Sequence, residues 1–291
     1  MKWLVEEYDD HVKELVAEIE KQGHTCDFIK YYDMIKDSNY TGTGLPKTKG
    51  NFDELECVLF YGSIQLAGWL MRHRKWIPTV WYSYDKYKYS HFASKLGQHL
   101  LNNEFVLLPK GLILDRRFDL FNQFGFDHNL FIRPDNGTKS FGGKVFQLET
   151  FEKDWNNATH LMEDHELVVI SRPWKIGKEW RFICTGNEII TGSQYKDSGS
   201  AEIMAGYDSW AYDKCLEVIK EGYHPDPMYT VDIGKCGNDE VPIGDHLDHY
   251  FLIEINNFCC SGLYACDLEK IVSTASALAI KEHQQYYNEY L

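Results

Sequence analysis

YFLIEINNF, residues 250–258, is an apolar segment interrupted by one carboxylate and, two residues later, by one amide. The alternation of side chains along a strand places Leu252, Glu254 and Asn256 on one face and Ile253 on the other. The acid and the amide therefore face the same side, with their Cα atoms about 7 Å apart. Two oxygen-bearing groups together on an otherwise apolar strand indicate a binding site.

A second segment, MYTVDIG at 228–234, carries an acid in the same way. Thr230 and Asp232 alternate with apolar neighbours, so both face one side of a strand. Pairing of this strand with 250–258, as a hairpin around the polar insertion between them, would bring Asp232 beside Glu254 and Asn256. Two carboxylates and an amide oxygen are hard ligands that suit Mg²⁺, which also takes water and phosphate oxygens. The sequence therefore predicts a magnesium site here.

The segment 165–195 is typical of a buried strand followed by a hairpin. Its two hairpin strands, EWRFIC and EIITGSQY, flank a Thr-Gly-Asn turn. Glu179 and Arg181 share one face of the first of these strands. A structural salt bridge across the sheet explains such a pair, and this is the interpretation that the segment alone favours.

The stretch FIRPDNGTKSFGGKVF, residues 131–146, combines cations with glycines. An apolar strand delivers Arg133, and Lys139 and Lys144 bracket Phe141-Gly142-Gly143. Glycines let backbone N–H groups approach a ligand closely, and the cations can neutralise phosphate oxygens. A triphosphate would fit this arrangement. An ordinary hairpin with surface lysines fits it as well, and the stretch alone leaves both interpretations open.

The first 100 residues alternate between short apolar runs and amphipathic helices. The segment DDHVKELVAEIEKQG carries apolar residues at helical spacing and ends at Gly23, and runs of strand length follow at 25–31, 57–63 and 78–83. This alternation predicts an open, largely parallel α/β sheet. From about residue 100, hairpins replace it, which predicts an antiparallel α+β second half closed by an amphipathic helix over 267–287. The glycines at 41–51 resemble a phosphate loop only weakly, because no GK[ST] ending follows.

Composition and charge exclude several classes of protein. The chain has 291 residues, 44% of them hydrophobic, with a net charge of -14 and a pI near 5.3. Phosphate affinity depends on clustered Lys and Arg, so a general nucleic-acid or anionic-membrane binder is not expected. The eight cysteines form no CxxC pair, and the amino terminus lacks a secretory apolar region. We expect reduced cysteines and a cytoplasmic protein, in the host cytoplasm if the chain is viral.

The ordered motifs of residues 100–275 resemble the ATP-grasp superfamily. They run from the basic glycine hairpin, through a strand ending in G-x-E, to V-D-I and finally L-I-E-I-N. The chain is most similar to a divergent clade of phage and bacterial proteins that is related to the eukaryotic translation-initiation-factor assembly chaperone. The resemblance implies an α/β domain at 1–100 and an ATP-grasp domain at 101–291. Two antiparallel-sheet subdomains, about 101–170 and 171–291, would sandwich ATP.

The resemblance also implies nucleotide contacts. Arg133 stands where many members have a phosphate-binding lysine, and Lys139 would reach the α- or β-phosphate. The segment from Ser171 to Trp174 would be the hinge whose backbone meets adenine, and Glu179 would hold the ribose hydroxyls. ATP is therefore the expected nucleotide.

The remaining implied roles concern the triphosphate end of the site. Asp232, Glu254 and Asn256 would hold Mg²⁺, and Arg181 would stabilise the transferred phosphoryl group. Arg172 departs from the family, because many members have a glutamate at this hinge position. The loop 256–267 is expected to form the wall on the acceptor side.

Three functions follow as alternatives. The first is an ATP-dependent carboxylate–amine ligase that forms an amide or peptide bond through an acyl phosphate, acting on a small molecule, a peptide or a protein. The second is an ATP-binding assembly factor without ligase turnover. The third is a plain α/β interaction protein, which would need Asp232, Glu254 and Asn256 to be exposed, apart and indifferent to metal. The oligomeric state is not readable from the sequence.

Overall fold

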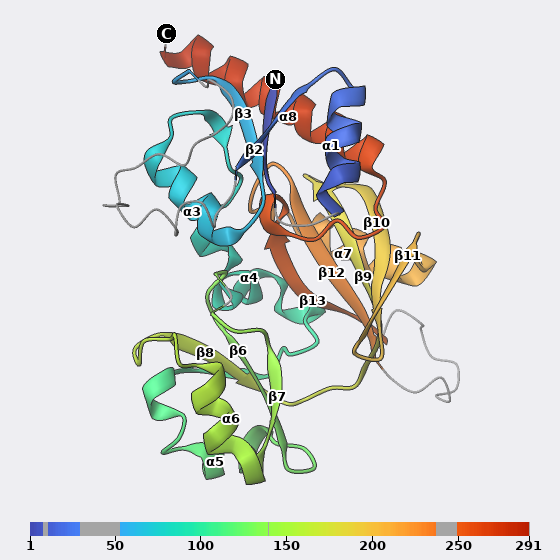
Figure 1. The fold of residues 1–291 in the computed structure, drawn as a ribbon. Coiled ribbons are helices and arrows are strands. Elements are labelled where there is room, and N and C mark those ends of the chain that lie inside the picture. Colours follow the sequence, from blue (N-terminus) through green and yellow to red (C-terminus); the bar gives the residue numbers. More distant parts are fainter. Residues whose placement is uncertain (8–10, 30–52, 139, 237–248, 291) are drawn as a thin grey trace.

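Three sheets flanked by helices make up the computed structural model, which describes residues 1–7, 11–29, 53–138, 140–236 and 249–290 (Figure 1). The loop predicted at 41–51 and the candidate Lys139 lie outside these residues. Within them, no helix is both long and apolar enough to cross a membrane.

The first sheet is parallel, with strand order β2-β1-β3-β4. Its central strands, KWLVE and CVLFY, are apolar runs buried on both faces, as expected for a parallel sheet covered by helices. Helix α3 begins after Ser63, whose Oγ accepts a hydrogen bond from the Leu66 N–H at 3.4 Å. The predicted α/β unit is confirmed, and its elements are β1 (Lys2–Glu6), α1 (His11–Lys21), β2 (Thr25–Ile29), β3 (Cys57–Tyr61), α3 (Ile64–His73), β4 (Ile77–Thr79) and α4 (Tyr89–Leu96).

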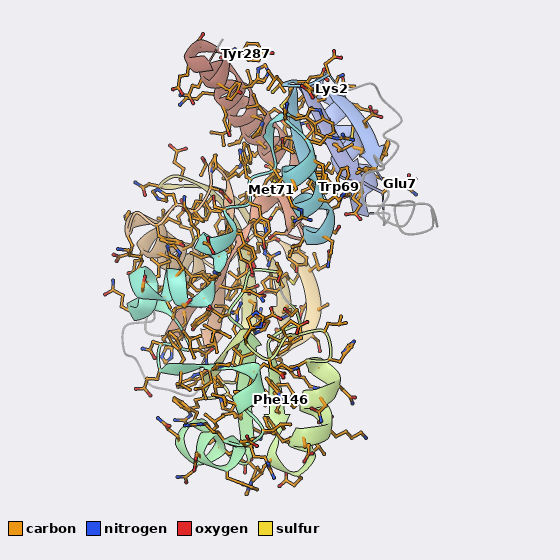
Figure 2. The ribbon with its side chains drawn as sticks, turned by 90° about the vertical axis from the view of Figure 1, so that its left-hand side faces the viewer. Lys2, Glu7, Trp69, Met71, Phe146 and Tyr287 are labelled. Carbon is orange, nitrogen blue, oxygen red and sulfur yellow. The ribbon has the colours of Figure 1, made fainter. Side chains whose placement is uncertain are left out.

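The C-terminal helix α8 (Leu268–Tyr290) returns to this first sheet. It packs against α1, β3 and β4, so both chain ends lie at the same end of the molecule (Figure 1). The Trp3 indole N–H donates to Ser276 Oγ at 3.1 Å, and the Trp81 indole N–H donates to Glu282 Oε2 at 2.8 Å. In Figure 2 the labelled Lys2 and Tyr287 accordingly lie near one another, far from Phe146. The last helix therefore covers part of the first sheet and also contacts β10 (Glu188–Asp197) of the third sheet.

The second sheet is antiparallel and small, with strand order β5-β8-β6-β7. Helices α5 and α6 pack on it through a separate aromatic core, in which the rings of Phe151 and Trp155 stack at 5.9 Å and both contact Phe146. Figure 2 labels Phe146 in this part of the molecule. We call this part the small lobe. Its elements are β5 (Phe105–Pro109), α5 (Arg117–Phe124), β6 (Asn129–Pro134), β7 (Lys144–Gln147), α6 (Phe151–Ala158) and β8 (Leu167–Ser171).

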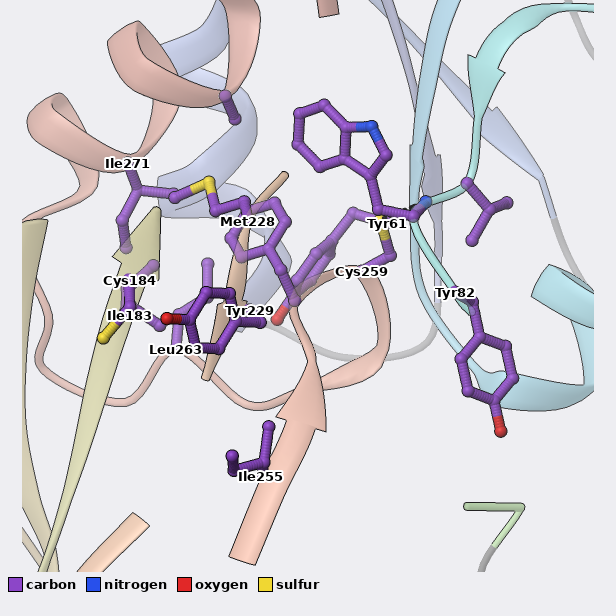
Figure 3. Packing of buried hydrophobic residues seen from close by; sticks show 14 of the residues in the cluster. Tyr61, Tyr82, Ile183, Cys184, Met228, Tyr229, Ile255, Cys259, Leu263 and Ile271 are labelled. Atoms are coloured by element: carbon purple, nitrogen blue, oxygen red, sulfur yellow. Dashed lines mark hydrogen bonds between the residues drawn. The ribbon is translucent and has the colours of Figure 1, made fainter. Parts of the chain in front are cut away.

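The third sheet is antiparallel and large, with strand order β11-β10-β9-β12-β13. Its apolar side chains continue into the core of the first sheet; Figure 3 shows Met228 and Tyr229 near Ile183, with Cys259 beside Tyr61. The predicted antiparallel second half is thus confirmed. The elements are β9 (Ile176–Thr185), β10 (Glu188–Asp197), β11 (Ser200–Ala205), α7 (Ser209–Lys220), β12 (Tyr229–Cys236) and β13 (Tyr250–Asn257).

One detail of the predicted alternation in β13 is wrong. Asp232 pairs with Glu254, but the next residue of β12, Ile233, pairs with Leu252, so Ile253 is an extra residue in a β-bulge. Leu252 consequently faces the core with Ile255, whereas Ile253 lies beside Glu254. The bulge thus reverses which side chains of β13 face the core, just before Glu254.

Candidate active site

A cavity of about 830 Å³ lies between the two antiparallel sheets. Its walls come from β6, the glycine turn before β7, the segment 174–177, the adjoining parts of β9 and β10, and the bulge of β13. A Cβ atom on Gly143 would come within 2.9 Å of the Phe131 ring, so glycine lets this turn lie close against β6. The volume falls within the range of about 300–1,000 Å³ typical of small-ligand sites.

A buried ion pair anchors the site on the large sheet. Arg181 donates from Nε to Asp232 Oδ1 at 2.7 Å and from Nη2 to Oδ2 at 2.6 Å, and its Nη1 donates to the Gly262 carbonyl at 3.2 Å. Burial disfavours the charged guanidinium, but the Asp232 carboxylate outweighs this and raises the pKa of Arg181 well above its usual value. This two-pronged pairing fixes both side chains.

The structure brings the three predicted metal ligands together. Asp232 and Glu254 pair across β12 and β13, and Asn256 is opposite Thr230 in the same register. The Asn256 Nδ2 lies 2.8 Å from Glu254 Oε1 and 3.5 Å from Asp232 Oδ2, so the amide bridges the two carboxylates. The requirement of the interaction-protein alternative, that the three be exposed and apart, is therefore not met.

Arg133 reaches this group from the other side of the cavity. Its Nη2 lies 2.9 Å from Glu254 Oε2, and the two side chains are 16% and 17% exposed. The guanidinium also lies 5.1 Å from the Tyr89 ring, while its buried Nε has no hydrogen-bond partner within the described part of the chain. The pair joins β6 of the small lobe to β13 of the large sheet.

Glu179 and Arg181 face the same side, as predicted, but they have different partners. Glu179 Oε2 accepts from the Tyr195 hydroxyl at 2.6 Å, and its Oε1 lies 3.6 Å from Lys196 Nζ. Tyr195 stacks on Tyr264 at 4.9 Å, and the Arg181 guanidinium lies 5.4 and 5.2 Å from the two rings. Burial, then the charges of Asp232 and Glu179, raise the pKa of Tyr195 well above its usual value.

Sequence reasoning missed the role of Tyr195. The pairing of β10 with β9 shifts by one residue between Ile189 and Thr191, and this irregularity places Tyr195 on the same face as Glu179. Simple alternation along EIITGSQY contains no signal for the shift. Tyr264, in contrast, was expected on the acceptor-side wall as part of the loop 256–267.

The predicted hinge shows two different environments. Ser171 is fully buried at the end of β8 and pairs with Phe105 and Phe131, and its hydroxyl has no hydrogen-bond partner among the described residues. Trp174 is 47% exposed and lines the cavity, with the Arg172 guanidinium 5.2 Å from its ring. Of these residues, Trp174 is the one positioned to contact a ligand through its side chain.

The donor set fits a magnesium ion that arrives with phosphates. In the part of the chain that the structure describes, no three His, Cys, Asp or Glu side chains cluster as a metal site. The site instead offers the carboxylates of Asp232 and Glu254 and the amide of Asn256. Mg²⁺ commonly takes only one or two protein carboxylates, and water and phosphate oxygens complete its coordination. Asp232, Glu254 and Asn256 could hold such an ion. Arg133 supplies a cation for the phosphates that would accompany it.

We expect Tyr195→Phe to destabilise the protein by about 1–3 kcal/mol, because the change removes the hydroxyl that donates to a buried carboxylate. Urea unfolding measures this difference. Tyr207→Phe, at an exposed tyrosine after β11, is the matched control and should change stability by less than about 0.5 kcal/mol. Equal losses in the two variants would contradict the importance of the Tyr195–Glu179 bond.

Comparisons with known structures agree on the fold. A D-alanine–D-alanine ligase from Coxiella burnetii aligns with a TM-score of 0.63 at 13% identity, over 99% of this chain and 97% of that one. The D-cycloserine synthetase DcsG aligns with a TM-score of 0.62 at 10% identity, over 96% and 100%. The ATP-grasp ligase PsnB, in complex with a precursor variant, Mg and ADP, aligns with a TM-score of 0.55 at 13% identity, over 96% and 98%. The comparison with curated proteins gave no match.

A family model identifies the central part of the chain. The model of the ATP-grasp domain, R2K clade family 2, matches residues 113–274, which include β6, β9, β12 and β13 with their polar side chains. This match covers more than half of the 291 residues. The protein therefore belongs to the R2K clade of the ATP-grasp superfamily, in its family 2.

Proposed function

We propose that the protein is an ATP-dependent carboxylate–amine ligase that forms an amide or peptide bond through an acyl phosphate. The observation that carries this proposal is the polar row from Arg181 through Asp232, Asn256 and Glu254 to Arg133, beside the cavity between the two sheets. The row combines oxygen ligands for a metal ion with guanidinium groups for phosphates. The solved structures of similar fold named above are a synthetase and two ligases.

In this proposal the cavity between the sheets binds ATP. Arg133 and Lys139 contact its phosphates, the segment from Ser171 to Trp174 lies beside adenine, and Glu179 holds the ribose. The volume of the cavity and its mixture of apolar walls and charged side chains support a nucleotide. Arg133, Trp174 and Glu179 all line it.

The chemistry depends on positioning and charge. Asp232, Glu254 and Asn256 would hold Mg²⁺, which would supply positive charge for the phosphate oxygens. A substrate carboxylate oxygen attacks the γ-phosphorus and the bond to the ADP oxygen breaks; an amine then displaces phosphate and forms the amide. Arg181, held rigidly by Asp232, stabilises the negative charge of the transferred phosphoryl group.

The finer assignments complete the proposal. Residues 1–100 form the preceding α/β domain, and 101–170 and 171–291 form the two ATP-grasp subdomains. The substrates are a small-molecule, peptide or protein carboxylate and an amine, in the cytoplasm or, for a phage protein, in the host cytoplasm. The alternative is an assembly factor that would bind ATP without ligase turnover. This alternative would accompany a relationship of the clade to the eukaryotic translation-initiation-factor assembly chaperone.

We expect ATP and Mg²⁺ together to raise the midpoint of thermal unfolding by about 5 °C or more at 100 times the dissociation constant, since such binding contributes about 2.7 kcal/mol. ATP alone and Mg²⁺ alone should each give a much smaller rise. Without Mg²⁺ the phosphates and the carboxylates of the site repel each other, and without ATP the metal ion lacks its phosphate ligands. The absence of any shift at millimolar concentrations of both ligands would contradict the nucleotide site.

Release of ADP distinguishes the ligase from the assembly factor. A ligase should release ADP and phosphate only when a suitable carboxylate is present, and should form an amide when an amine is added. We expect such dependence in a screen of pooled amino acids, peptides and hydroxy acids. Binding of Mg²⁺ and ATP without carboxylate-dependent ADP release throughout the screen would favour the assembly factor.

A further inference from the structure

The two arginine–carboxylate pairs of the site differ in how firmly they are held. Arg181 and Asp232 form two hydrogen bonds, on adjacent strands of one sheet, and Asp232 is fully buried. Arg133 and Glu254 are joined by one hydrogen bond of 2.9 Å between different sheets. Both of these side chains are partly exposed and line the cavity. The first pair is therefore a fixed part of the sheet, whereas the second can separate.

Both oxygens of Glu254 are engaged in the present arrangement. Oε2 accepts from Arg133 and Oε1 accepts from the Asn256 amide. A divalent cation approaching Glu254 would meet a guanidinium on one oxygen and an amide N–H on the other. The guanidinium, whose Nη2 is 2.9 Å from Glu254 Oε2, would repel the cation, and such repulsion is strong in a partly buried site. The carboxylate is thus shielded from a metal ion that arrives alone.

The hydrogen-bonding capacity of the Arg133 guanidinium is only partly used. Its buried Nε has no hydrogen-bond partner among the residues that the structure describes, and the guanidinium lies 5.1 Å from the Tyr89 ring. The pair with Glu254 therefore satisfies only part of the donor capacity of Arg133. A phosphate group, with several acceptor oxygens, matches a guanidinium better than a single carboxylate oxygen does.

We infer that Arg133 and Glu254 are exchangeable counter-ions that couple metal binding to nucleotide binding. Without nucleotide they neutralise each other and keep divalent cations out. When metal and triphosphate bind together, Glu254 turns to the metal and Arg133 turns to a phosphate, so each charge gains a new partner. The inference rests on the proposed nucleotide site and concerns its regulation.

Mn²⁺ binding without nucleotide tests this inference, measured by the loss of the free-ion signal in electron paramagnetic resonance. We expect Arg133→Met to bind Mn²⁺ about tenfold more tightly than the wild type, because the competing cation is gone. Arg133→Gln should behave in the same way and serves as a second neutral variant. Arg133→Lys, which keeps the charge, is the matched control and should bind Mn²⁺ as weakly as the wild type.

The same variants should change nucleotide binding in the opposite direction. In the presence of Mn²⁺, we expect Arg133→Met to bind the non-hydrolysable analogue AMPPNP about tenfold more weakly than the wild type, because a phosphate contact is lost. A purely structural role of Arg133 predicts that both affinities fall. Tighter metal binding together with weaker nucleotide binding is therefore specific to the exchange.

Two outcomes separate failure of this inference from failure of the proposed function. If the wild type binds Mn²⁺ and AMPPNP together, but neither neutral variant binds Mn²⁺ more tightly than the wild type, the exchange is wrong and the nucleotide site stands. If the wild type does not bind the two ligands together, the nucleotide site itself is wrong. Adding Glu254→Gln to Arg133→Met should abolish the gain in Mn²⁺ affinity; persistence of the gain would also overturn the exchange.

Discussion

Glu254→Gln is expected to reduce ATP turnover by about 100-fold or more while changing the free energy of unfolding by only about 1 kcal/mol. The large effect on turnover follows from losing a carboxylate that would hold Mg²⁺ at the triphosphate. The small effect on stability follows from the conservative change, because a glutamine keeps a side-chain oxygen that can still accept one of the hydrogen bonds from Arg133 and Asn256. Steady-state ADP release and urea unfolding measure the two quantities.

Glu202→Gln is the matched control for this prediction. Glu202 is an exposed glutamate on β11, at the outer edge of the same sheet and away from the cavity. We expect both its turnover and its stability to match the wild type. Turnover in Glu254→Gln that equals the control would remove Glu254 from the metal site, and with it the central element of the proposed mechanism.

Asp232→Ala is expected to destabilise the protein by about 3–5 kcal/mol. The change leaves the buried Arg181 guanidinium without its two-pronged partner, and an uncompensated buried charge costs far more than the net contribution of the pair. Urea unfolding of the purified variant measures the loss. Replacing both members, as in Arg181→Met with Asp232→Leu, should recover most of the stability, because no charge then remains buried.

An exposed ion pair provides the reference for Asp232→Ala. Lys110 Nζ lies 3.0 Å from Asp164 Oδ1, and the Asp164 side chain is 83% exposed. Asp164→Ala should therefore cost less than about 1 kcal/mol. A similarly small loss in Asp232→Ala would mean that the Arg181 charge finds solvent or another partner, which would contradict its rigid placement in the proposed mechanism.

Most of the fold was predictable because the spacing of apolar residues along the sequence reflects which face of each helix or strand is buried. The alternation of short apolar runs with amphipathic helices in the first 100 residues predicted a parallel sheet, and the alternation around Asp232 predicted its meeting with Glu254 across β12 and β13. The bulge at Ile253 was not predictable, because the same sequence can pair with its neighbouring strand either regularly or with one residue left unpaired.

The contacts that join distant segments were also beyond sequence reasoning. The pairing of Arg133 with Glu254 spans 121 residues and depends on how the small lobe stands against the large sheet. The return of α8 to β3 and β4 depends likewise on tertiary packing, since any amphipathic helix can cover any apolar face. Individual site residues were therefore identifiable, but the partners that determine their charges were not.

The small lobe begins and ends at one place. The chain passes into the lobe near Asn102 and leaves it near Arg172, and the Asn102 side-chain amide donates to the Arg172 carbonyl at 2.9 Å. A second tie lies at the other end of β6, where Asp135 accepts hydrogen bonds from the Ser90 N–H at 2.7 Å and the Ser90 hydroxyl at 2.9 Å, at the start of α4. Leu101 and Asn102 line the cavity at the crossing. The crossing and the Asp135–Ser90 contact together hold the small lobe against the rest of the molecule, so they set the width of the cavity without touching the large sheet.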